Sequence, residues 1–270
     1  MLPTSHTALH TETFGEGDHL ALIHGWGAQN TVWREWAKIH LAPHFCVTLI
    51  ELPGFGDSAA LPNSDDIETA WLNAILEVLP PHTHLLGWSL GGLLAQKIAV
   101  RAPTQITSLI CLASTPKFVQ TEGWNWAVSP ALLGDFIQAI GQDTLATLKH
   151  FWKLQIQGSD GARLLIKEFS LRMTHSKIPQ MDGLIQGLQL LKAMDCRQDA
   201  ATLTCPVLWL LGENDPLIPQ DFITQFSTIQ PTAQVVILTG AAHMPFLSHP
   251  HDTAAHIIAF LKTVKTVNRI

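Results

Sequence analysis

A serine lies between two glycines in the segment Gly-Trp-Ser-Leu-Gly at residues 87–91. An apolar, strand-like run precedes this segment, and a helix-like stretch begins at Leu90. A serine in this setting is typical of a nucleophile elbow, a strand-to-helix turn so tight and strained that glycines must flank it. The turn would lift the hydroxyl of Ser89 clear of the sheet. The alternative is a glycine-rich turn whose serine has no chemical role. A base and an acid at suitable positions elsewhere in the chain would favour the nucleophile elbow over this alternative.

Two later strand ends supply a base and an acid in the required order. A serine hydroxyl is a poor nucleophile unless a base accepts its proton and a third group orients that base. Functional groups in open α/β sheets lie at the carboxyl ends of strands. Asp215 and His243 each follow a buried, strand-like run. The order Ser89, Asp215, His243 therefore predicts a catalytic triad, with Glu213 as a competing acid.

Acyl transfer also needs N–H donors for the oxyanion that develops on the ester carbonyl. One predicted donor is the backbone N–H of Leu90, directly after the nucleophile. The other is the backbone N–H of Trp26, in the loop His-Gly-Trp-Gly at residues 24–27, where glycines allow a close approach to substrate. We expect the side chains of Trp26 and Trp88 to line a pocket for the acyl group of the substrate. Simple core packing is the alternative for each tryptophan.

Short apolar runs alternate with helical patterns along most of the chain. The predicted strands are residues 19–24, 46–52, 83–87, 106–113, 206–211 and 234–238. The predicted helices are residues 31–40, 64–79, 90–101, 221–228 and 252–264. Continuous apolar strands indicate a parallel sheet with helices on both faces. The pattern therefore predicts an α/β fold with a mostly parallel, doubly wound sheet, to which residues 11–14 add an antiparallel edge.

The alternation of strands and helices stops between residues 117 and 187. This stretch has helical periodicity, is divided by glycines and prolines, and is too long for a loop within a compact domain. We interpret it as an inserted helical cap, with residues 1–116 and 188–270 forming the core. Ordinary crossover helices are the alternative.

The composition excludes several classes of protein. Charged residues are 14% and apolar residues 47% of the 270 residues, which favours a folded domain over a disordered chain. The net charge of −6 argues against nucleic-acid binding. The N-terminal residues lack the features of a signal peptide, and no apolar run reaches the roughly 18 residues of a membrane span.

Cysteine and histidine usage bears on compartment and cofactors. The four cysteines form no Cys-x-x-Cys pair, and the fourteen histidines show no zinc-binding spacing. We therefore expect reduced thiols, no metal and no other cofactor. The expected protein is cytoplasmic and monomeric, and does not bind membranes.

Four motifs resemble those of the α/β-hydrolase superfamily. They are His-Gly-Trp-Gly at 24–27, Leu-Pro-Gly-Phe-Gly-Asp-Ser at 52–58, Gly-Trp-Ser-Leu-Gly-Gly at 87–92 and Gly-Ala-Ala-His-Met-Pro-Phe at 240–246. The resemblance spans nearly the whole core and implies the α/β-hydrolase fold. The chain also resembles, more specifically, the BioH family of pimeloyl-acyl-carrier-protein methyl ester esterases. This resemblance rests on the motifs at 24–27 and 87–92, on the last motif extended to residue 250, and on the cap segment Phe-Trp-Lys-Leu-Gln at 151–155.

That family resemblance implies a serine carboxylesterase of biotin biosynthesis. It implies hydrolysis of the methyl ester of pimeloyl-acyl-carrier protein to pimeloyl-carrier protein and methanol, through an acyl-enzyme on Ser89. The catalytic residues it implies are Ser89, Asp215 and His243. The substrate contacts it implies are Trp26, Ser89, Leu90, Phe151, Trp152, Lys153, Leu154, Gln155 and His243.

An acidic carrier protein would need a local basic patch on a chain of net charge −6. Residues 149–177 hold six basic and two acidic residues, which gives +4 there and leaves −10 elsewhere. Lys149 and Lys153 are four residues apart and share one helix face, as do Arg163 and Lys167. We expect these four residues to form a carrier-protein patch. A solvated cap surface is the alternative.

The same triad on the same fold also supports other reactions. The alternatives are a broader short-chain carboxylesterase and a hydrolase of carbon–carbon bonds. Dehalogenase chemistry would need an aspartate in place of Ser89. A non-catalytic ligand-binding protein would usually have lost a triad residue or Gly25, and all of these are present.

Overall fold

The protein is built on a seven-stranded sheet with the order β1-β3-β2-β4-β5-β6-β7. The computed structural model describes residues 8–174 and 176–267. Its strands are β1 (Thr11–Phe14), β2 (His19–Ile23), β3 (Cys46–Ile50), β4 (Thr83–Trp88), β5 (Ile106–Leu112), β6 (Val207–Gly212) and β7 (Gln234–Leu238). β1 pairs antiparallel with β3, and the other strand pairs are parallel. The predicted sheet and its antiparallel edge are confirmed. The expectation about a signal peptide rests largely on residues 1–7, which lie outside the described residues.

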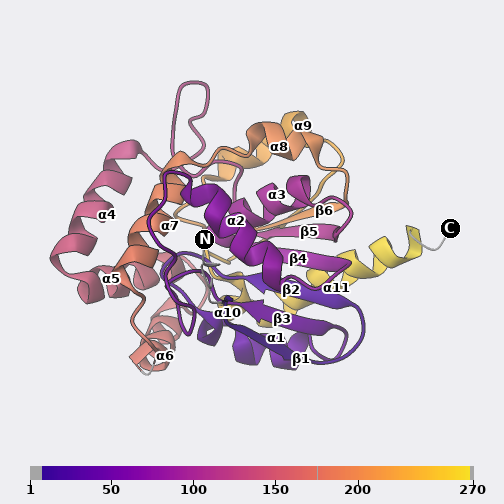
Figure 1. Ribbon diagram of the computed structural model, residues 1–270, viewed down its shortest axis with the longest axis horizontal. Helices are drawn as coiled ribbons and strands as arrows, with labels where there is room; N and C mark the ends of the chain where they lie inside the picture. Colours follow the sequence, from indigo (N-terminus) through magenta and orange to yellow (C-terminus); the bar gives the residue numbers. More distant parts are fainter. Residues whose placement is uncertain (1–7, 175, 268–270) are drawn as a thin grey trace, which may run out of the picture.

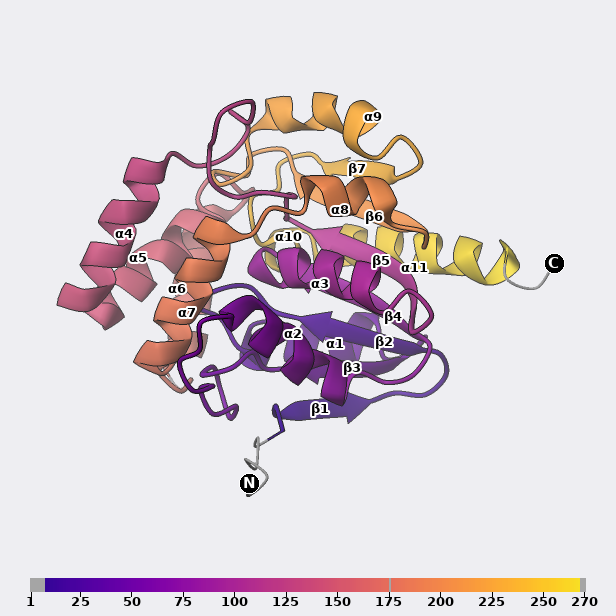
Figure 2. The same cartoon turned by 45° about the horizontal axis from the view of Figure 1, so that its top comes forward.

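Helices cover both faces of this sheet, as expected of a doubly wound fold (Figures 1 and 2). One face carries α2 (Ile67–Val78), α3 (Leu90–Arg101) and α8 (Arg197–Thr202), and the other carries α1 (Arg34–His40) and α11 (Pro250–Val267). The short helices α9 (Phe226–Ile229) and α10 (Pro245–Ser248) lie in connections. None of the helices in the described part of the chain combines the length and apolarity that a membrane span requires.

Two predicted helices are broken in the structure. Residues 31–40 form a 3₁₀ helix, η1 (Asn30–Val32), followed by α1, because Trp33 between them is not helical, with φ −132° and ψ 0°. The indole of Trp33 is fully buried and packs against Trp88 and Phe246. Residues 221–228 likewise form a 3₁₀ helix, η2 (Gln220–Gln225), followed by α9. At Trp33, tertiary packing overrides the local helical pattern.

Four further helices lie together at one end of the sheet (Figures 1 and 2). They are α4 (Pro130–Gln142), α5 (Thr144–Ile156), α6 (Ala162–Thr174) and α7 (Met181–Ala193), and all are inserted between β5 and β6. The side chains of Ser129 and Asp143 cap the first two by accepting from backbone N–H groups. The predicted cap boundary at residue 187 falls inside α7, because this helix packs on α4 as well as on α2 and α3 of the core.

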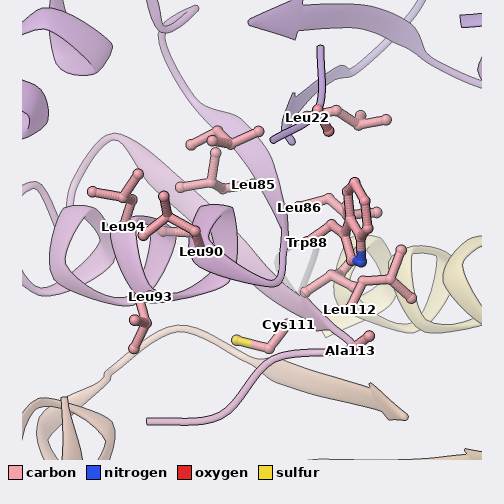
Figure 3. Packing of buried hydrophobic residues seen from close by; sticks show 14 of the residues in the cluster. Leu22, Leu85, Leu86, Trp88, Leu90, Leu93, Leu94, Cys111, Leu112 and Ala113 are labelled. Carbon is pink, nitrogen blue, oxygen red and sulfur yellow. The ribbon is translucent and has the colours of Figure 1, made fainter. Parts of the chain in front are cut away.

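The strand–turn–helix unit around Ser89 is buried almost throughout. Every residue of β4 is buried. In Figure 3, Leu85 lies with Leu90 and Leu94 of α3 on one side of β4, while Leu86 and Trp88 lie on the other. Side chains alternate across a strand, so both faces of β4 anchor the turn that follows it. Each such buried leucine typically contributes about 1.5–3 kcal/mol, which holds the turn firmly in place.

The helix α7 approaches the core so closely that only glycine fits at the contact. A side chain on Gly183 would lie 2.6 Å from the carbonyl oxygen of Pro53 and 2.8 Å from Cα of Gly54. Gln180 strengthens the contact, because its N–H donates to the Gly54 carbonyl oxygen at 2.8 Å. The loop after β3 and the start of α7 therefore form one packed unit.

Replacing Gly183 with alanine should displace α7 and lower the free energy of unfolding by about 1–3 kcal/mol, because rigid backbone blocks the new methyl group. Urea denaturation measures the change. Gly134→Ala in α4 is the matched control, since no atom lies within 4 Å of the added methyl group. The control should raise stability by about 0.5–1 kcal/mol. Equal effects of the two substitutions would contradict the close-contact explanation.

Candidate active site

Ser89 adopts a strained backbone conformation between β4 and α3. Its φ is 56° and its ψ is −119°, a combination that L-residues rarely adopt. A side chain on Gly87 would lie 2.2 Å from the carbonyl oxygen of Gly91. A side chain on Gly91 would lie 2.2 Å from the carbonyl oxygen of Ile23. The elbow therefore requires glycine on both sides of the serine, as the sequence predicts.

Ser89, His243 and Asp215 form one hydrogen-bonded chain. His243 Nε2 lies 2.9 Å from Ser89 Oγ, and His243 Nδ1 lies 2.7 Å from Asp215 Oδ2. An ionised carboxylate only accepts, so Nδ1–H donates to Asp215 and Nε2 accepts from the serine hydroxyl. The side chains of His243 and Asp215 are fully buried. This is the arrangement in which a histidine can take the proton of an attacking serine.

Backbone amides hold the carboxylate of Asp215 in place. Its Oδ1 accepts from the N–H of Leu217 at 2.8 Å and from the N–H of Ile218 at 3.2 Å, which leaves Oδ2 for the imidazole. The competing acid, Glu213, instead accepts from the N–H of Gly240 at 3.0 Å. Glu213 therefore stabilises the loop that contains Gly240, whereas Asp215 orients the imidazole of His243.

The loop at residues 24–27 passes directly over the serine. A side chain on Gly25 would lie 3.0 Å from Cβ of Ser89. Within residues 8–174 and 176–267, the backbone N–H of Trp26 donates to no acceptor. The N–H of Leu90 belongs to the first turn of α3, where amides lack partners within the helix. Both predicted oxyanion donors thus lie beside Ser89, and their role stays a prediction.

A buried, neutral histidine fixes that loop. His24 Nε2 accepts from the N–H of Leu52 at 3.1 Å, which leaves Nδ1–H to donate to the Gly25 carbonyl oxygen at 2.8 Å. Burial is the main cause that lowers the pKa of His24 to about 4, and the Gly25 carbonyl opposes it more weakly. The uncharged ring therefore ties the loop over Ser89 to the segment after β3.

An apolar cavity of about 90 Å³ opens above Ser89. Its lining comes mostly from the cap helices and consists of Trp26, Ser89, Phe118, Val119, Val128, Leu132, Leu133, Phe136, Phe151, Leu154, Leu188, Leu191 and Leu217. All of these residues except Ser89 are apolar. The cavity therefore suits a hydrocarbon chain attached to a group that reacts at the serine.

The segment 151–155 contributes only one helix face to the cavity. Phe151 and Leu154 line it, and they are three residues apart on α5. Trp152, Lys153 and Gln155 do not line the cavity, and the substrate contacts expected of all five residues stay predictions. The Trp152 indole donates to the Gly27 carbonyl oxygen at 2.8 Å, Gln155 is buried, and Lys153 is exposed. Consecutive side chains of a helix point in different directions, so only some of the five face the cavity.

The structure places Trp26 at the cavity, where its substrate contact stays a prediction, and it places Trp88 away from the cavity, against expectation. Trp26 lines the cavity, and its indole donates to the Leu184 carbonyl oxygen of α7 at 2.9 Å. Trp88 is fully buried on the other side of β4 and packs edge-on against Phe246. Its indole donates to the His243 carbonyl oxygen at 2.8 Å, so it helps to hold the backbone of the histidine in place.

The four residues of the predicted basic patch lie exposed on α5 and α6. Lys149 and Lys167 line one surface hollow, and Arg163 and Lys167 line a second. Lys153 is one helical turn beyond Lys149 on α5. The fold thus brings together two basic pairs that the sequence placed on separate helices.

Several residues of the site were missed by sequence reasoning. They are the α4 residues Leu132, Leu133 and Phe136 and the α7 residues Leu188 and Leu191, all of which line the cavity. Their spacing of three or four residues signals an apolar helix face, but does not say what that face covers.

One group of three possible metal ligands occurs in the described part of the chain: His10, Glu51 and Asp57. Glu51 accepts from the backbone N–H groups of Asn30 and Asp57, and Asp57 pairs with Lys177. Burial raises the pKa of Glu51, although these N–H groups oppose that effect. The group fastens the loops after β2 and β3 to each other and to the cap.

Comparison with known proteins agrees with this architecture. Residues 20–256 match the sequence profile of the alpha/beta hydrolase family. The chain is 36% identical over 252 residues to the pimeloyl-[acyl-carrier protein] methyl ester esterase of Pseudoalteromonas atlantica, covering 92% of this chain and 95% of that protein. It is 38% identical over 242 residues to the protein of the same name from Aeromonas salmonicida, covering 89% and 94%. An esterase structure from Exiguobacterium antarcticum matches with a TM-score of 0.83 at 21% identity, over 94% of this chain and 95% of that one, which supports the fold alone.

Stability should fall as the pH drops through the range where His24 is protonated only in the unfolded chain. The ordinary pKa of 6.5 is lowered to about 4 in the folded protein, so the unfolded chain binds the extra proton between these values. The stability that neutral His24 contributes is complete above the pKa of the unfolded chain. It is lost progressively as the pH falls towards the pKa of the folded protein, by about 3 kcal/mol in all.

Urea unfolding between about pH 7 and pH 4 tests this expectation. His24→Asn removes the titrating group, so its stability should depend less steeply on pH than that of the wild type. Parallel pH profiles of the two proteins would show that His24 does not carry this dependence.

Proposed function

We propose that this protein removes the methyl group from a pimeloyl-acyl-carrier protein methyl ester. The chain belongs to the alpha/beta hydrolase family and, within it, to the pimeloyl-[acyl-carrier protein] methyl ester esterases. It is a carboxylic ester hydrolase. The products of the proposed reaction are pimeloyl-carrier protein and methanol, and the proposed pathway is biotin biosynthesis. The observation that carries the proposal is the hydrogen-bonded chain of Ser89, His243 and Asp215 at the base of an apolar cavity.

In the first half of the reaction, Ser89 Oγ attacks the carbonyl carbon of the methyl ester. His243 Nε2 accepts the serine proton, and Asp215 stabilises the resulting imidazolium while holding its orientation. The tetrahedral intermediate then collapses, the bond to the methoxy oxygen breaks, and His243 returns the proton to that oxygen. Methanol leaves, and the pimeloyl group remains as an ester on Ser89.

In the second half, water attacks the acyl-enzyme. His243 accepts a proton from the water, and collapse of the second intermediate transfers a proton back to Ser89 Oγ. The product leaves with a free carboxylate. The backbone N–H groups of Trp26 and Leu90 would stabilise both oxyanions, and one such donor typically contributes about 3–4 kcal/mol.

The cavity supports an extended acyl substrate. A pimeloyl chain joined to a carrier protein is a hydrocarbon chain whose far end carries the methyl ester. Phe136 of α4, Phe151 of α5 and Leu188 of α7 would enclose that chain while the ester reaches Ser89. Because all the walls are apolar, chain burial would position the ester without a charged side chain in the cavity.

The carrier protein would bind the cap through Lys149, Lys153, Arg163 and Lys167. Beside these cations, Leu145, Leu171 and Leu164 are 41%, 61% and 60% exposed. Leu145 and Leu171 line the same hollow as Lys149 and Lys167, and Leu164 lines the hollow of Arg163. Apolar side chains bordered by cations offer complementary contacts to an acidic protein surface.

A cytoplasmic location is part of the same proposal. It is supported by the four cysteines, all of which are free thiols, as is usual in a reducing compartment. The monomeric state stays a prediction from the sequence.

Hydrolysis of pimeloyl-carrier-protein methyl ester, measured beside short p-nitrophenyl esters, tests the proposed substrate. Ser89→Ala should lower kcat on both substrates by at least about 10⁴-fold, because it removes the nucleophile. Activity on short esters without turnover of the carrier-protein ester would instead indicate a broader short-chain esterase. Loss of neither activity in Ser89→Ala would contradict the assigned nucleophile.

The basic patch is tested by replacing Lys153, Arg163 and Lys167 together with glutamate. The triple variant should lower kcat/KM on the carrier-protein ester by about 10-fold or more, because like charges then face the acidic partner. Turnover of a short p-nitrophenyl ester should stay within about twofold, since that substrate needs no docking. An equal loss on both substrates would rule out a docking role.

A further inference from the structure

The turn between α5 and α6 contacts the loop that carries His243. The α5–α6 turn comprises residues 155–160, which are the last two residues of α5 and the four that follow. It belongs to the cap by sequence, whereas the histidine loop, residues 239–243, belongs to the core. The two segments are separated by about 80 residues in the chain, yet three hydrogen bonds join them. A fourth joins the turn to the loop that carries Asp215, because Asn214 Nδ2 donates to the Gly158 carbonyl oxygen at 3.0 Å.

The bonds to the histidine loop involve the backbone immediately around the imidazole. The N–H of His243 donates to the Gln155 carbonyl oxygen at 3.1 Å. The N–H of Ala242 donates to the hydroxyl oxygen of Ser159 at 3.1 Å. In the opposite direction, the N–H of Asp160 donates to the Gly240 carbonyl oxygen at 2.8 Å.

The core satisfies the remaining amides of this loop. The N–H of Gly240 donates to Glu213, and the N–H of Ala241 donates to the Leu238 carbonyl oxygen. Of the four consecutive amides at residues 240–243, the two nearest the imidazole are therefore held by the cap. Their surroundings are dry, because Gln155 is 1%, Ser159 7% and His243 0% exposed.

We propose that Ser159 is a positioning residue for His243, and that the α5–α6 turn thereby forms part of the machinery that activates Ser89. The inference rests on the proposed catalytic role of His243. Ser159 touches neither substrate nor the reacting atoms, and acts by fixing the backbone from which the imidazole projects. Of the three contacts, it is the only one made by a side chain and so the only one that a substitution removes directly.

The physical reason is the cost of an unpaired buried amide. Without the Ser159 hydroxyl, the Ala242 N–H loses its acceptor in a place with little access to water, and the loop relaxes to find another. His243 Nε2 must stay within hydrogen-bonding distance of Ser89 Oγ while Nδ1–H keeps its contact with Asp215. A shift of about 1 Å in such an arrangement can cost up to 100-fold in rate.

The cap helices differ in this respect. α4 lines the cavity, and its main helix contacts are with α5 and α7. The α5–α6 turn adds direct bonds to both loops of the triad. The cap thus encloses the substrate and also completes the support of the catalytic base.

Steady-state kinetics on a short p-nitrophenyl ester test the proposal in the full-length protein. Ser159→Ala should lower kcat by about 10-fold and leave KM within about twofold, because the cavity is unchanged. The rate at which a fluorophosphonate labels Ser89 should fall by a similar factor. Ser159→Thr keeps a hydroxyl acceptor and should recover most of both rates.

Thr31→Ala is the matched control. It removes a contact of 3.1 Å between the hydroxyl groups of Thr31 and Ser176, which also joins the core to the cap. Neither residue belongs to the loops that carry Asp215 and His243. It should leave kcat unchanged. If Ser159→Ala and the control behave alike, or if Ser159→Thr fails to recover activity while folding normally, the positioning role is wrong.

Amide hydrogen exchange separates failure of this inference from failure of the proposed function. Exchange at Ala242 and His243 should be faster in Ser159→Ala than in the wild type and unchanged in Thr31→Ala, whichever ester is the substrate. Unchanged exchange in Ser159→Ala would overturn the inference. An inactive wild-type protein with faster exchange in the variant would overturn the proposed function and leave the structural link standing.

Discussion

The close backbone approach at the turn after β4 is the constraint on which the site depends. Ser89 adopts a positive φ of 56° because the chain must reverse from strand to helix within a few residues. That reversal brings Gly91 against the carbonyl oxygen of Ile23 at the end of β2, so the turn is also locked to the neighbouring strand. The strain is sustained by buried leucines on α3 and by both faces of β4. A looser turn would lower the serine into the sheet, where neither base nor substrate could reach it.

The parallel sheet then brings the other groups to this point. β2, β4, β6 and β7 run in the same direction, so the loops after them meet at one edge. His24, Asp215 and His243 all lie on those loops, and each is fixed by backbone partners as well as by its functional neighbour. The result is a set of side chains oriented before any substrate arrives, which reduces the reorganisation needed during reaction.

The cap has two physical roles. Its apolar helix faces line the cavity above Ser89, which suits a hydrocarbon chain. At the α5–α6 turn, the Gln155 carbonyl oxygen and the Ser159 hydroxyl accept from the N–H groups of His243 and Ala242, and α7 packs on the loop after β3 through Gly183. Parts of the cap are therefore integral to the core, which explains why the sequence boundary at residue 187 falls within a helix.

The sequence by itself determined the sheet class, the elbow and the order of Ser89, Asp215 and His243, and it predicted the oxyanion role of the loop at residues 24–27. These features have local signatures, because a tight turn demands Gly87 and Gly91, and strand ends carry the acid and the base in a set order. Only the tertiary structure decided which face of α5 lines the cavity, that the Trp88 indole donates to the His243 carbonyl oxygen, and that Ser159 binds the histidine loop. Such contacts join residues about 80 to 155 positions apart in the chain, and they depend on how helices and loops pack in three dimensions, which local propensity and spacing do not encode.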